Sequence, residues 1–140
     1  MHPTDRSTPA LRWLLPVLAW AAGVLGMVAA WLAISLALRS PSGWLALVAA
    51  ADLALMLRLA AAPPGRARAI AATAGTAVAI VAGYWIYAAS LMGMSLGLQP
   101  MASALRMGPV LAGELLRHAT TGWDLAWALL ALPLAWRLAR

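Results

Sequence analysis

Four long apolar segments constrain this chain more than any other feature of its sequence. They cover residues 13–38, 44–62, 69–98 and 123–139. The hydrocarbon core of a bilayer is about 30 Å thick and a helix rises about 1.5 Å per residue, so each segment is long enough, or nearly long enough, to cross it. The chain is also 64% hydrophobic and only 10% charged, far from the balance of a soluble domain. The sequence therefore predicts an all-α, polytopic membrane protein, a four-transmembrane-helix bundle that forms one membrane domain over residues 1–140.

The ten arginines lie between these segments and predict the orientation of the chain. They form no basic stripe, so no nucleic-acid partner is expected despite the net charge of +6. Cytoplasmic loops carry an excess of basic residues, and four spans place both termini on one side. That side holds Arg6, Arg12, Arg58, Arg66, Arg68, Arg137 and Arg140, against Arg39, Arg106 and Arg117 on the other. We therefore expect cytoplasmic termini, and the composition is typical of a bacterial protein of the cytoplasmic (inner) membrane.

The segment between the third and fourth apolar stretches is amphipathic. Gly108 and Pro109 suit the start of a helix, which we expect over residues 109–119. Glu114, Arg117 and His118 share one face of that helix, and leucines occupy the other. The pattern predicts an extracytoplasmic interfacial helix between spans three and four. The Thr-x-x-Asp spacing from residue 121 to 124 then indicates a capping box at the start of span four.

Glu114 and His118 also have the spacing of a possible catalytic or metal-binding pair. Residues four apart lie side by side on a helix, so they could serve as general acid and base or supply two metal ligands. One Glu and one His are too few for a zinc site, and Arg117 is within reach of Glu114. We favour a solvated polar face with an exposed ion pair, and expect no enzyme activity, metal or cofactor.

Small residues at four-residue spacing mark two segments for close packing. The third carries a row of such residues, and the first carries a shorter one. Helix backbones approach closely along such faces in membranes, so we expect the first and third spans to cross there. A contact between two copies of the chain is the alternative use of the same row. The third-span residues are Ala71, Gly75, Ala79 and Gly83, and the first-span residues are Ala22 and Gly26, followed by Ala30.

Asp52 lies near the middle of the second apolar segment. A carboxylate at that depth costs roughly 2.5 to 3.5 kcal/mol on insertion scales, and such residues commonly have a partner and a function. Its own helix offers no basic or hydroxyl side chain three or four residues away. At matching depth the third segment offers Thr76 and Tyr84, and Pro133 frees the carbonyl of Leu129 in the fourth.

Two functional classes follow from these features. In the first, Asp52 makes a static interhelical hydrogen bond, and the protein is a non-enzymatic accessory or structural subunit of a membrane complex or homo-oligomer. In the second, low-dielectric surroundings keep Asp52 uncharged, and the chain is a minimal proton-coupled transporter or channel subunit. The expected partners are membrane lipids, and another membrane protein or a second copy of the chain.

Overall fold

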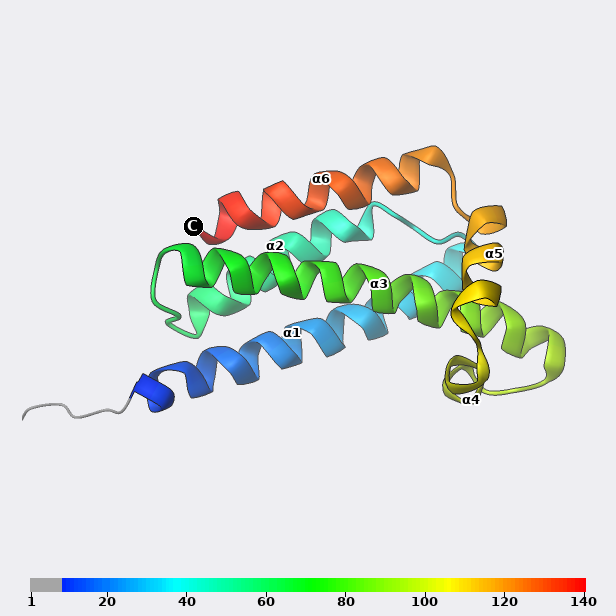
Figure 1. Ribbon diagram of the computed structural model, residues 1–140, viewed down its shortest axis with the longest axis horizontal. Coiled ribbons are helices and arrows are strands. Elements are labelled where there is room, and N and C mark those ends of the chain that lie inside the picture. The colour runs from blue at the N-terminus through cyan, green and yellow to red at the C-terminus, as the bar shows by residue number, and fades with distance from the viewer. Residues whose placement is uncertain (1–8) are drawn as a thin grey trace, which may run out of the picture.

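A computed structural model describes residues 9–140, so Arg6, counted above among the cytoplasmic arginines, lies outside the described residues. Within the described range the chain forms six helices and no strand, which confirms the all-α prediction (Figure 1). The helices are α1 (Pro9–Leu38), α2 (Leu45–Leu59), α3 (Arg66–Leu96), α4 (Pro100–Arg106), α5 (Pro109–Ala119) and α6 (Gly122–Ala139).

Four of these helices, α1, α2, α3 and α6, lie side by side along the long axis of the molecule (Figure 1). Helices α1 and α6 each pack against α2 and α3, and α2 and α3 also contact each other, so this pair forms the centre of the bundle. The short helices α4 and α5 lie together at one end, which we call the outer end. The start of α1 and the C-terminus lie at the opposite, inner end.

The lengths of these helices differ from the segments expected from the sequence. Two described helical stretches, Ala10–Leu38 and Arg66–Leu96, are long and apolar enough to cross a membrane. Helix α2 has 15 residues, about 22 Å, whereas the sequence predicted a span over residues 44–62. It ends early because Ala61 adopts a left-handed conformation with a φ of 55°. The N–H groups of Ala61 and Ala62 then close the helix by donating to the carbonyls of Arg58 and Leu57.

Tryptophan side chains of α1 fill the notches in the small-residue row of α3. The Trp20 indole lies against Gly75, and its Nε1–H donates a hydrogen bond to the Ala71 carbonyl at 2.8 Å. The Trp31 ring is fully buried, and a Cβ added at Gly83 would lie 2.8 Å from its nearest atom. The glycines therefore admit large rings between the two helices rather than a second row of small residues.

The predicted contribution of Ala22 and Gly26 to this crossing needs correction. Both residues lie on the exposed face of α1, and a Cβ added at Gly26 would have no neighbour within 4 Å. Helix α1 instead turns Val24, Met27 and Trp31 inward. These large side chains make more packing contacts with the other helices than Ala22 and Gly26 would, which accounts for the rotation of α1.

A matched pair of glycine substitutions tests the notch at Gly83. We expect Gly83→Ala to destabilise the protein by about 1 to 3 kcal/mol, because the new methyl group would meet the buried Trp31 ring. Gly26→Ala, also within a helix but facing open space, should be neutral or stabilising by at most about 1 kcal/mol. Unfolding of the purified protein in mild detergent, followed by circular dichroism, measures both. Equal effects would show that the notch is not tightly packed.

Candidate functional site

Asp52 lies on the edge of α2 that faces α1. Its side chain is partly buried, and Oδ2 lies 3.5 Å from the position that a Cβ on Gly23 would occupy. Within residues 9–140 the carboxyl group has no hydrogen-bond or ion-pair partner. Asp52 is therefore a partly exposed carboxyl group near the midpoint of α2, beside Gly23 of α1.

The structure does not bring Asp52 to the partners expected from the sequence. The Thr76 hydroxyl donates to the carbonyl of Ala72 in its own helix at 2.8 Å. The Tyr84 hydroxyl is buried and has no partner in the described chain, and its ring packs against Trp31 with centroids 5.3 Å apart. Helix α2 directs Ala49, Ala50 and Leu53 into the bundle, and Asp52 is therefore rotated by about 100° from Leu53, towards α1.

A second polar cluster lies at the outer end, around Asp124 at the start of α6. The sequence predicted only the part of it within α6. Asp124 accepts hydrogen bonds from the backbone N–H of Thr121 at 2.9 Å and from the Thr121 hydroxyl at 2.8 Å, which confirms the expected capping box of α6. Its other oxygen accepts a hydrogen bond from the Gly43 backbone N–H at 2.9 Å. Asp124 therefore ties the start of α6 to the loop between α1 and α2.

Residues 41–43 of that loop are buried, and hydrogen bonds hold the Pro41 carbonyl and the Gly43 N–H. The Trp31 indole N–H and the Ser35 hydroxyl both donate to the Pro41 carbonyl, at 2.9 and 3.2 Å. A Cβ added at Gly43 would lie 2.7 Å from Oδ1 of Asp124, so only glycine fits there. The signal in the sequence was a glycine after Pro41 and Ser42, but nothing local indicated that its partner lies 81 residues away.

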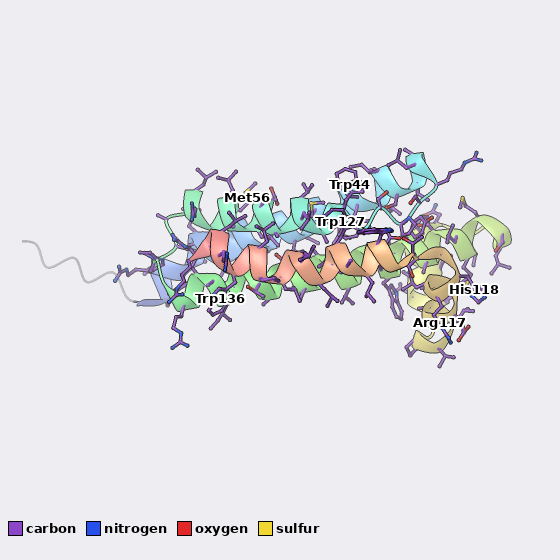
Figure 2. All side chains as sticks on the ribbon, turned by 90° about the horizontal axis from the view of Figure 1, so that it is seen from above. Trp44, Met56, Arg117, His118, Trp127 and Trp136 are labelled. Atoms are coloured by element: carbon purple, nitrogen blue, oxygen red, sulfur yellow. The ribbon has the colours of Figure 1, made fainter. Side chains whose placement is uncertain are left out.

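The amphipathic helix at the outer end has the predicted bounds, residues 109–119. Glu114, Arg117 and His118 are exposed, while Ala112 is buried against α3. Figure 2 shows Arg117 and His118 together on α5. Arg117 approaches the Glu114 carboxylate at 3.4 Å, and His118 Nδ1 lies 2.8 Å from the backbone carbonyl of Glu114. The imidazole therefore does not contact the carboxylate, and the arrangement is a solvated polar face.

Neither cluster offers a metal site, since the described residues contain no group of three or more His, Cys, Asp or Glu side chains able to hold a metal ion. Comparison of the chain with protein-family models, with curated proteins and with solved structures found no match.

A matched pair of acidic substitutions tests the role of Asp124. We expect Asp124→Ala to lower the free energy of unfolding by about 1 to 3 kcal/mol, because the N–H groups of Gly43 and Thr121 lose their acceptor. Glu114→Ala removes the other acidic residue of this end, but that residue makes only an exposed ion pair, so its effect should stay within about 0.5 kcal/mol. Thermal unfolding in one detergent compares them. Two equal and small effects would show that the hydrogen bonds between Asp124 and the loop before α2 do not stabilise the fold.

Proposed function

We propose that this chain is an integral protein of the bacterial cytoplasmic membrane with four transmembrane helices, and that it acts as a non-enzymatic subunit of a membrane assembly. Its partner is another membrane protein or a second copy of itself. The observation that carries this proposal is Asp52, a partly exposed acidic residue near the middle of α2 with no partner in the described chain.

The exposed surfaces of all four long helices support insertion into a bilayer. Large apolar side chains point outward on each of them, and leaving so much apolar surface in water would favour aggregation. This includes the two shorter helices, α2 and α6. Examples are Leu18 on α1 at 59% exposure, Leu55 on α2 at 53%, Val81 on α3 at 66% and Leu129 on α6 at 63%.

The buried loop before α2 explains how so short a helix belongs to a four-span bundle. Non-helical backbone is tolerated at membrane depth only where protein covers it and satisfies its polar groups. Residues 41–43 are buried and hydrogen-bonded in this way. These residues, which precede the first turn of α2, therefore extend this crossing towards the outer surface. A modest local thinning of the bilayer accommodates the remaining difference between the length of the crossing and the hydrocarbon thickness.

The distribution of arginines supports an inner end that faces the cytoplasm. The end where α2 finishes and α3 begins carries Arg58, Arg66 and Arg68, and the chain terminus adds Arg137 and Arg140. Arg68 also fixes the end of α6 by donating to the Ala139 carbonyl at 2.6 Å. The outer end carries Arg39, Arg106 and Arg117. The positive-inside rule then places both termini in the cytoplasm.

Cysteine labelling tests the number of spans, because the chain has no native cysteine. Ser40 and Ala67 are both exposed and lie at opposite ends of α2. If α2 crosses the membrane, Ser40→Cys reacts with a membrane-impermeant maleimide from outside and Ala67→Cys reacts only after permeabilisation. If only α1 and α3 cross, both positions lie on one side and react alike, which would overturn the four-span proposal.

Asp52 links this topology to assembly. A carboxyl group near the bilayer centre is costly when it faces lipid, and a donor from another chain removes that cost. Thr76 cannot supply it, since its hydroxyl bonds to its own helix. The alternative is a proton-coupled transporter or channel subunit in which Asp52 takes up and releases the proton. Both proposals place Asp52 at the site of action but differ in whether its ionisation matters.

Two substitutions at Asp52 separate these proposals. Asp52→Asn keeps shape and hydrogen bonding but cannot ionise, so an assembly subunit should retain its partner. Asp52→Leu removes the hydrogen bond, and we expect the complex to weaken about 3- to 30-fold because a polar contact between membrane helices contributes about 0.6 to 2 kcal/mol. The measurement is native mass spectrometry of the tagged protein after extraction in nanodiscs.

The matched control is Val48→Leu, an exposed apolar position four residues earlier on α2. It should leave the complex intact, which separates the loss of the polar contact from a general disturbance of the helix. Loss of proton-linked transport in proteoliposomes with Asp52→Asn, while the oligomer is unchanged, would favour the transporter instead. Retention of every partner in Asp52→Leu would overturn the assembly proposal.

A further inference from the structure

A cavity of about 550 Å³ lies between α3, α5 and α6 at the outer end. This volume is within the range of small-molecule sites, roughly 300 to 1,000 Å³. Its wall is almost entirely apolar. The apolar side chains belong to Ile80, Val81 and Trp85 of α3, Leu116 of α5, and Leu125 and Ala128 of α6.

The cavity is continuous with the surface that would face lipid. Val81 and Leu125 line it and are 66% and 64% exposed, so its side opening lies where the acyl chains of the outer leaflet run. Water would find few hydrogen-bond partners inside it. A hydrocarbon chain would instead meet the apolar walls, and it could enter directly from the bilayer. The shape and chemistry therefore suit an acyl chain.

A charged group in the same wall points to a ligand that also has a headgroup. Arg117 lines the cavity from α5, and its side chain is 79% exposed. Only its Nη1 contacts Glu114, at 3.4 Å, so most of its five N–H donors are available. Acceptor oxygens on an occupant would satisfy these donors. The Tyr84 ring also lines the cavity, but its hydroxyl is buried out of reach of an occupant.

We propose that this cavity binds one phospholipid of the outer leaflet. One acyl chain fills the space between α3 and α6, and the phosphate accepts hydrogen bonds from the Arg117 guanidinium, the geometry in which arginine binds phosphate most strongly. The glycerol region then lies beside α5, the amphipathic helix at the membrane surface. The site requires that the chain is embedded in a bilayer, but it does not depend on the assembly role of Asp52.

Native mass spectrometry with phosphatidylglycerol as the probe tests this site. When phosphatidylglycerol is added to the delipidated protein in detergent, the protein should bind and retain one molecule, and Arg117→Ala should weaken that binding about tenfold. Arg106→Ala is the matched control, because Arg106 is an exposed outer-end arginine that does not line the cavity. Equal retention in wild type and Arg117→Ala, or equal losses in the two arginine variants, would overturn the proposal.

A second pair of measurements separates the acyl chain from the headgroup. Ala128→Leu adds bulk inside the cavity and should reduce retention of phosphatidylglycerol, with helicity and thermal unfolding showing that the fold persists. Diacylglycerol, which has the chains but no phosphate, should bind the wild type weakly and be unaffected by Arg117→Ala. If the wild type bound diacylglycerol tightly, the Arg117 guanidinium would have no role in binding. If Ala128→Leu retained phosphatidylglycerol fully, the acyl chain of the lipid would lie outside this cavity. Cysteine labelling reports on membrane insertion independently of either result.

Discussion

The need to satisfy backbone polar groups away from water governs the outer half of this protein. Residues 41–43 of the loop between α1 and α2 are buried, where an unpaired N–H or carbonyl would be costly. Trp31 and Ser35 donate to the Pro41 carbonyl, and Asp124 accepts from the Gly43 N–H. These bonds hold the end of α1, the start of α2 and the start of α6 in one arrangement.

Two tryptophans of α1 donate hydrogen bonds and also fill space between helices. Trp31 uses its indole N–H for the loop, while its ring fills the notch at Gly83 and stacks obliquely on Tyr84. One side chain therefore joins α1 to the loop and to α3. Trp20 repeats the arrangement towards the inner end, where its ring lies on Gly75 and its N–H bonds to Ala71. In both cases a glycine in α3 provides the space, and a nearby carbonyl removes the cost of burying the indole N–H.

Local patterns in the sequence were enough to predict the helical class, the bounds of α5 and the capping box at Asp124. Each of these depends on residues within a few positions of one another. The features that the sequence did not reveal depend on distant contacts, above all the bond from Asp124 to Gly43 and the rotation of α1 that exposes Gly26. The left-handed turn at Ala61 shortened α2 without a glycine or asparagine to signal it. The short helix α4 was missed because seven residues carry too few turns for a periodic pattern.

Among the acidic side chains of the described residues, Asp52 is the one without a hydrogen-bond or ion-pair partner, since Glu114 contacts Arg117 and Asp124 accepts hydrogen bonds. Thr73, Thr76 and Ser90 all donate to the carbonyl four residues earlier, so their own helix satisfies them. Asp124 has three donors from two elements. A carboxyl group has no local arrangement of this kind in the middle of a helix, because the N–H groups around it are already used in the helix. Its partner must come from outside the helix, and Gly23 of α1, which lies beside the carboxyl group, has no side chain to offer. Asp52 is therefore the acidic side chain among residues 9–140 that the fold leaves for a second molecule or a proton.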